Sequence, residues 1–163
     1  MNTGKANYYC GAFSTYLISN NVEPVLFDAG KNSKAIRFSI GSKDYKAFIK
    51  YSASPSKTKS GTRWNISFTE EEQKRLGEFA EAGRENIVVI VCAAPGSDQK
   101  TFSVFPQATA MACLGNDSVN KGRRISVYHK KGGHKLQIYG TAVDEKMAYC
   151  IPRCCDEYFG FKK

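Results

Sequence analysis

The chain has 163 residues and a mass of 18.1 kDa, which is the size of one domain with a substantial core. A hydrophobic content of 42% with 12% aromatics excludes an intrinsically disordered chain, and no apolar run of about 18 residues predicts a membrane span. The 24 Lys and Arg exceed the 15 Asp and Glu, so the formal net charge is +9 and a polyanion is a natural partner.

The opening residues, MNTGKANYYCG, lack the basic and apolar regions of a secretion signal, so we expect a cytoplasmic protein with reduced cysteines. Cys150, Cys154 and Cys155 form a C-x3-C-C cluster, whereas zinc sites usually show two spaced pairs. The remaining cysteines fall one each in predicted helices and a predicted buried strand. We therefore expect small core residues rather than a zinc site.

The first part of the chain predicts a helix followed by three strands. Apolar residues at helical spacing predict an amphipathic helix over residues 6–20. Residues 24–28, 35–40 and 45–51 read as strands, and the short turn at 41–44 predicts that the second and third form a hairpin.

A fourth strand, a helix and a buried strand follow. Residues 63–68 alternate as a strand, and Thr69 and Glu72 then form the capping box of a helix that we expect to end near Ala82, with Gly83 as its C-cap. The unbroken apolar run at 87–92 is typical of a strand covered on both faces.

The last third predicts a strand at 102–105, a short helix at 107–114 and a hairpin of 124–128 with 135–139. The fold class is therefore α/β or α+β, with a mixed central sheet flanked by helices. We expect a single domain over residues 1–163, with a core at 6–106 and a helix-plus-hairpin extension at 107–163.

Three polar side chains suggest a catalytic site. Asp28 ends the first predicted strand, while Asp44 and Lys46 share one face of the third. Two carboxylates can hold Mg²⁺, and a lysine beside them can orient the attacking water and stabilise phosphate charge. Asp28, Asp44 and Lys46 are thus the candidate catalytic residues, with the two aspartates as metal ligands.

The order helix–strand–strand–strand–helix–strand, with Asp28 and then Asp44-x-Lys46, resembles the PD-(D/E)XK nuclease superfamily of restriction-endonuclease-like proteins. The resemblance covers roughly residues 6–106 and implies Mg²⁺-dependent phosphodiester hydrolysis. A second register aligns Lys50 with the family lysine, which places Phe48 at the acid position and implies an inactive site. Asp44 also fits a plain turn residue.

Two basic stretches contain no acidic residue. Residues 50–63 carry four Lys or Arg and residues 121–135 carry six, whereas residues 70–85 carry six Glu against three Lys or Arg. Basic clusters favour nucleic acid through phosphate neutralisation. The expected nucleic-acid-binding residues are Lys50, Lys57, Lys59, Arg63, Arg123, Arg124, Lys130, Lys131 and Lys135.

The sequence thus favours a nucleic-acid-binding protein with a nuclease-like core, with DNA preferred over RNA as the partner. Mg²⁺ is its cofactor if the site is active. The alternative is a non-catalytic nucleic-acid-binding or protein-interaction module on the same scaffold, and a homodimer is compatible with either. No glycine-rich phosphate loop is present, which argues against ATP or dinucleotide chemistry.

Overall fold

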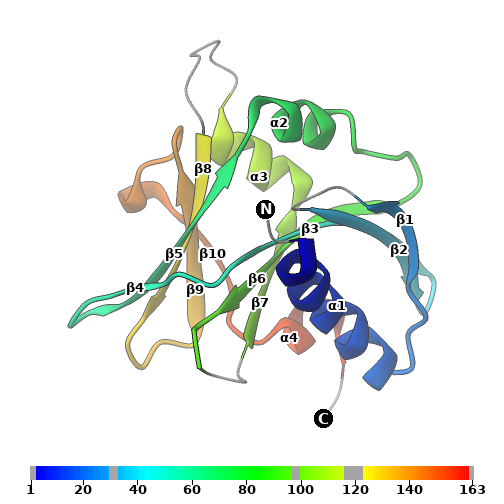
Figure 1. The fold of residues 1–163 in the computed structure, drawn as a ribbon, viewed down its shortest axis with the longest axis horizontal. Helices are drawn as coiled ribbons and strands as arrows, with labels where there is room; N and C mark the ends of the chain where they lie inside the picture. Colours follow the sequence, from blue (N-terminus) through cyan, green and yellow to red (C-terminus); the bar gives the residue numbers. More distant parts are fainter. Residues whose placement is uncertain (1–2, 30–32, 97–99, 116–122, 162–163) are drawn as a thin grey trace.

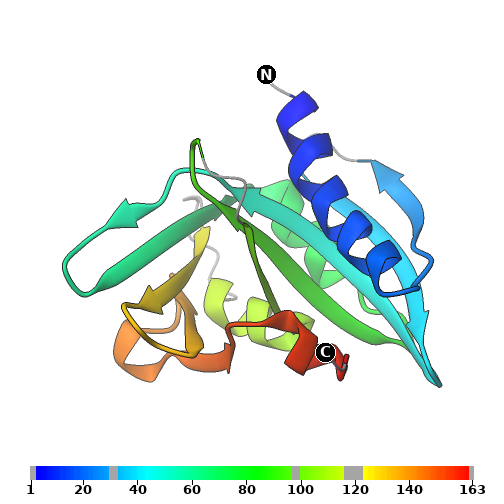
Figure 2. The same cartoon turned by 90° about the horizontal axis from the view of Figure 1, so that it is seen from below.

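Two five-stranded β-sheets pack face to face at the centre of the protein, and helices lie around them (Figures 1 and 2). The structure is a computed structural model that describes residues 3–29, 33–96, 100–115 and 123–161. It is a mixed α and β fold, as the sequence predicts.

The first sheet, sheet A, has the strand order β1-β2-β3-β6-β7. Its strands are β1 (Val25–Ala29), β2 (Lys34–Ile40), β3 (Lys43–Ser52), β6 (Glu85–Ala93) and β7 (Lys100–Pro106). The pairing of β3 with β6 is parallel and the other pairings are antiparallel, so the sheet is mixed. The predicted β2–β3 hairpin and the buried β6 are both confirmed.

The second sheet, sheet B, is antiparallel throughout, with the order β10-β9-β8-β5-β4. Its strands are β4 (Ser56–Lys57), β5 (Gly61–Phe68), β8 (Arg123–Lys130), β9 (Lys135–Gly140) and β10 (Tyr149–Pro152). The predicted β8–β9 hairpin is confirmed, and its partner β5 comes from the middle of the chain.

The helices are α1 (Thr3–Ser19), α2 (Glu70–Gly77), α3 (Gln107–Leu114) and α4 (Cys155–Phe159), with a short 3₁₀ helix, η1, at Glu145–Met147. α1 lies across the outer face of sheet A, while α2 and α3 close one end of the space between the sheets (Figures 1 and 2). No helix in the described ranges is long and apolar enough to cross a bilayer.

Two apolar cores result from this arrangement. One lies between α1, α4 and the outer face of sheet A, where Phe13 and Leu17 pack on Ile49 and Val89. The other lies between the two sheets, and it includes the inward side chains of β5 and β8. The Trp64 Nε1 donates to the Ala93 carbonyl at 2.9 Å, which joins sheet B to sheet A.

The structure corrects two expectations. A single central sheet flanked by helices is wrong, because the second face of sheet A is covered largely by sheet B. The capping box of Thr69 and Glu72 is present, but α2 ends at Gly77 rather than near Ala82. The chain leaves the helix there because Phe79 packs edge-on against Phe48 in the core, with ring centroids 5.6 Å apart.

Candidate nucleic-acid interface

The first basic stretch forms a hairpin tip between β4 and β5. The Thr58 amide donates to the Gly61 carbonyl at 2.9 Å, and the Thr58 hydroxyl oxygen accepts from the Ser60 and Gly61 amides at 3.3 Å. These bonds define the turn and leave Lys57 and Lys59 exposed. The sequence predicts a plain loop here, but the structure has a hydrogen-bonded turn with two exposed lysines.

The second basic stretch forms the β8–β9 hairpin tip. The Gly133 amide donates to the Lys130 carbonyl at 2.8 Å, and Gly132 takes the positive φ of +78° that such a tight turn requires. The exposed side chains at this tip are those of Lys130, Lys131, His134 and Lys135.

The two tips touch each other. The Lys131 amide donates to the Ser60 carbonyl at 2.8 Å, and the Tyr128 hydroxyl donates to Ser60 Oγ at 2.9 Å. Gly61 permits this approach, because a Cβ at that position would lie 2.3 Å from the His129 carbonyl oxygen. Both tips project from the same end of sheet B, and we call this surface the basic end (Figure 1). Its members are Lys57, Lys59, Lys130, Lys131 and Lys135.

The basic end has no internal countercharge. Residues 53–67 and 123–143 contain no Asp or Glu, and within the described chain no lysine of the basic end forms an ion pair. The glutamates of α2 follow the opposite end of β5, which is roughly 23 Å away at about 3.3 Å per strand residue. The molecule therefore has a cationic end and an acidic end.

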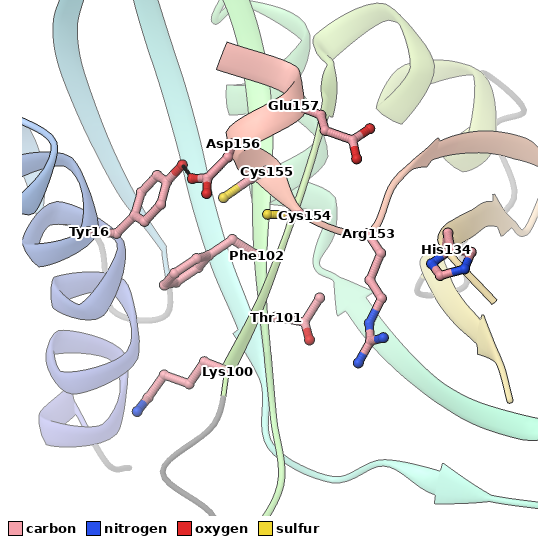
Figure 3. Close-up of a pocket in the computed structure, with 10 residues that line it drawn as sticks. All are labelled: Tyr16, Lys100, Thr101, Phe102, His134, Arg153, Cys154, Cys155, Asp156 and Glu157. Atoms are coloured by element: carbon pink, nitrogen blue, oxygen red, sulfur yellow. Dashed lines mark hydrogen bonds between the residues drawn. The ribbon is translucent and has the colours of Figure 1, made fainter. Parts of the chain in front are cut away.

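A hollow of about 460 Å³ adjoins the basic end and extends toward α4 (Figure 3). The Arg153 amide donates to the His134 carbonyl at 3.2 Å, which ties this hollow to the β8–β9 tip. Figure 3 shows Arg153 and His134 on one side and the Tyr16–Asp156 pair on the other. Arg153 therefore adds one exposed cation near the five lysines, while Asp156 and Glu157 line the same hollow.

At the far side of this hollow, a hydrogen bond joins α1 to α4, the two helices on the outer face of sheet A. The Tyr16 hydroxyl donates to Asp156 Oδ1 at 2.5 Å. Burial is the main cause that raises the Tyr16 pKa, and this hydrogen bond raises it further. Burial also raises the pKa of the neighbouring Cys155 thiol to about 12, so both groups stay protonated near neutral pH. The pair links α1 to α4 and supplies no activated nucleophile.

Two expected phosphate contacts are wrong, because Lys50 and Arg123 are interior. Each residue is only 5% exposed. The Lys50 ammonium lies 2.8 Å from Glu72 Oε2 and donates to the Ser67 carbonyl at 2.6 Å, while the Arg123 guanidinium donates to the Leu114 carbonyl at 2.7 Å. Burial lowers the pKa of Lys50, and Glu72 acts against that shift.

Arg63 and Arg124 lie on the outer face of sheet B. They line a second hollow with Tyr139 and the segment that follows β9. These two arginines therefore form a separate group from the lysines of the basic end.

The expected catalytic residues are not brought together. Asp28 of β1 pairs with Ala35 of β2, whereas Asp44 of β3 pairs with Ser39, four residues further along β2. β1 and β3 lie on opposite edges of β2, so two strand spacings also separate the aspartates. At about 3.4 Å per residue and 4.8 Å between strands, their Cα atoms lie on the order of 16 Å apart. Side chains as short as aspartate cannot share one Mg²⁺ across that span.

Asp44 and Lys46 have other partners. Asp44 is exposed at the β2–β3 turn, where its carboxylate accepts from Ser39 Oγ at 2.5 Å. The Lys46 ammonium donates to the Phe79 carbonyl at 2.8 Å and lies 3.9 Å from Glu81. Burial is the main cause that lowers the Lys46 pKa, with Glu81 opposing it. Asp44 therefore stabilises a turn, and Lys46 holds the segment after α2 against β3.

The three cysteines in the predicted helices and buried strand, Cys10, Cys92 and Cys113, are buried in the cores, as the sequence predicts. In the C-terminal cluster Cys155 is buried, whereas Cys150 and Cys154 are exposed. In the part of the chain that the structure describes, no three His, Cys, Asp or Glu side chains form a group that could hold a metal.

Sequence reasoning finds the lysines of the basic end but not the residues that align them. Ser60, Gly61 and Tyr128 join the two tips, and their pairing spans 68 residues of chain between Ser60 and Tyr128. The only local signal is the small-residue pair Ser60-Gly61 directly before an alternating strand.

Comparison with known proteins identifies no relative of this chain. No family model matches the chain, and neither curated proteins nor solved structures show a significant match to it.

Proposed function

We propose that this protein binds nucleic acid through the basic end. The observation that carries the proposal is the contact between two acid-free hairpin tips, made by the Lys131–Ser60 hydrogen bond. That contact places lysines from two distant segments on one surface. Phosphates are the natural counterpart, because binding them releases condensed counterions.

The chemistry of the basic end favours contacts to the phosphate backbone over contacts to base edges. Its five cations are all lysines, whose compact ammonium groups act as point charges without the planar fork that reads guanine. Contacts of this kind position a protein on nucleic acid but carry no sequence information. We therefore expect binding that is sensitive to salt and largely independent of sequence, with duplex DNA as the first probe.

Hydrolysis is not part of the proposal, since the strand register separates Asp28 from Asp44. Supercoiled plasmid incubated with the protein and Mg²⁺ should show no nicking above the level without metal. Mg²⁺-dependent nicking that disappears in Asp44→Ala would restore the nuclease hypothesis and its metal site.

Fluorescence anisotropy with a short labelled duplex, titrated at several salt concentrations, tests the binding. The double variant Lys59→Gln/Lys131→Gln should lose about two units of the slope of log K against log salt, one for each phosphate contact. A matched control, Lys43→Gln/Lys74→Gln, removes the same charge from the exposed β2–β3 turn and from α2, and should keep most of the slope.

Two results would contradict the proposal. One is a salt slope near zero for the unmodified protein. The other is an equal loss in the two double variants, which would mean that only total charge matters and that the basic end is not the interface.

A further inference from the structure

The second hollow lies on the outer face of sheet B, apart from the basic end. It has a volume of about 530 Å³, and three strands contribute to its lining through Arg63 of β5, Arg124 of β8 and Tyr139 of β9. Arg63 faces outward because its neighbour Trp64 points into the core, and successive strand residues face opposite sides. The segment after β9, including Asp144 and Glu145, forms the remaining wall.

Two buried polar atoms in this hollow lack hydrogen-bond partners. Tyr139 is 4% exposed, and its hydroxyl is buried and unpaired, as is Nε of Arg63. Within the described ranges only one other side-chain nitrogen or oxygen, Nε of Arg37, is in that state. An unpaired buried polar group costs about 1–3 kcal/mol, so two of them in one hollow indicate a missing partner.

The missing partner must accept hydrogen bonds. A guanidinium has donors and no acceptor. Burial raises the Tyr139 pKa, so the phenol is neutral near pH 7 and its O–H can donate. Arg63 and Arg124 line the same hollow, and their positive charge opposes that shift. Donors and positive charge at one point suit an oxyanion.

The opposite wall has the reverse character. Glu145 lines this wall, and its negative charge acts on the Tyr139 pKa in the same direction as burial. Asp144 Oδ1 accepts from the Lys146 amide at 2.9 Å and caps η1, which leaves its second carboxylate oxygen available. Carboxylates beside an oxyanion site suit a ligand that also carries hydroxyl donors, as acidic residues do for ribose.

We propose that this hollow binds a phosphorylated sugar, with the phosphate on Arg63, Arg124 and Tyr139 and the sugar hydroxyls on Asp144 and Glu145. The ligand can be a free sugar phosphate or the phosphorylated end of a nucleic acid. The inference does not depend on the basic end, which shares no residue with the hollow.

Isothermal titration calorimetry with ribose 5-phosphate, in a buffer without phosphate, tests the proposal. Tyr139→Phe and Arg63→Gln should each weaken binding roughly tenfold, because each removes a hydrogen bond to a charged group. The matched controls are Tyr149→Phe and Lys43→Gln, which alter exposed residues outside the hollow and should bind as the unmodified protein does. Ribose without phosphate should not bind.

Thermal unfolding supplies a second readout that does not need tight binding. Tyr139→Phe removes an unpaired buried hydroxyl, so the free variant should unfold at a temperature equal to or above that of the unmodified protein. Ribose 5-phosphate should then raise the unfolding temperature of the unmodified protein more than that of the variant.

A second titration distinguishes the sources of the ligand. An oligonucleotide with a 5′-phosphate that binds more tightly than its unphosphorylated form, with the difference lost in Tyr139→Phe, identifies the end of a nucleic acid. Equal binding of the two oligonucleotides, with ribose 5-phosphate still bound, identifies a free sugar phosphate. No binding of ribose 5-phosphate at millimolar concentration, or equal binding by Tyr139→Phe, overturns the proposal.

Discussion

Lys46 and Lys50 of β3 and Lys57 and Lys59 of the next hairpin are neighbours in the chain with opposite environments. The two β3 lysines point to the face of sheet A that sheet B and the α2 segment cover, and each has carbonyl and carboxylate partners. The two hairpin lysines are exposed. A lysine is available to a ligand only where no second layer covers its strand face, and four predictions test this contrast between the covered face and the basic end.

The largest expected effect concerns a thiol on the covered face. Burial raises the pKa of Cys92 from 9.0 to about 12, so the unfolded chain loses this proton at lower pH than the folded protein does. The free energy of unfolding should therefore fall between pH 9 and pH 12, by about 1.4 kcal/mol per pH unit from this group.

Urea unfolding at several alkaline pH values measures that slope. Cys92→Ala should flatten it, whereas Cys150→Ala, which alters an exposed cysteine, should leave it unchanged. Identical slopes for the two variants would show that Cys92 is not protected by the covered face.

The buried ion pair should give the next largest effect. Glu72→Gln keeps an acceptor for the Thr69 amide but leaves Lys50 charged and unpaired, which should destabilise the protein by about 3–5 kcal/mol. Chemical denaturation compares it with Glu71→Gln, an exposed neighbour in the same helical turn, which should change stability by less than about 0.5 kcal/mol. Similar losses in both would mean that Lys50 is not buried with Glu72.

An intermediate effect is expected where the two tips meet. Gly61→Ala places a methyl group against the His129 carbonyl and the Tyr128 ring, and should cost about 1–3 kcal/mol. Because the tips must separate to relieve the clash, DNA affinity should fall although no charge is removed. The control is Gly11→Ala, where the added Cβ meets open space inside α1. It should leave DNA affinity unchanged and should not lower stability, because Ala favours a helix over Gly. If the folded Gly61→Ala variant binds DNA with unchanged affinity, binding does not depend on the contact between the two tips.

The smallest effect on stability should come from the basic end itself. Lys59→Gln/Lys131→Gln removes two exposed charges without ion-pair partners in the described structure, so the free energy of unfolding should change by less than about 0.5 kcal/mol. Denaturation on the same preparation used for the binding assay checks this. A loss above 2 kcal/mol would mean that these lysines support the fold.

Local patterns predict most elements but not how the layers meet. The capping box at Thr69 and the apolar run of β6 fix a helix start and a covered strand without any distant information. The alternation of β3 separates its two faces, yet nothing local says that sheet B will cover the face with Lys50. The same limit applies to Asp28 and Asp44, whose separation depends on the register of both with β2.

The path of the chain between the sheets has a consequence for cooperativity. The chain completes β3 in sheet A, forms β4 and β5 in sheet B, returns for β6 and β7, and leaves again for β8 to β10. Neither half of the polypeptide contains a whole sheet, so neither can bury its apolar face alone. Unfolding should therefore be a single all-or-none transition, and folding should be slow for a protein of this size because its pairings close long loops.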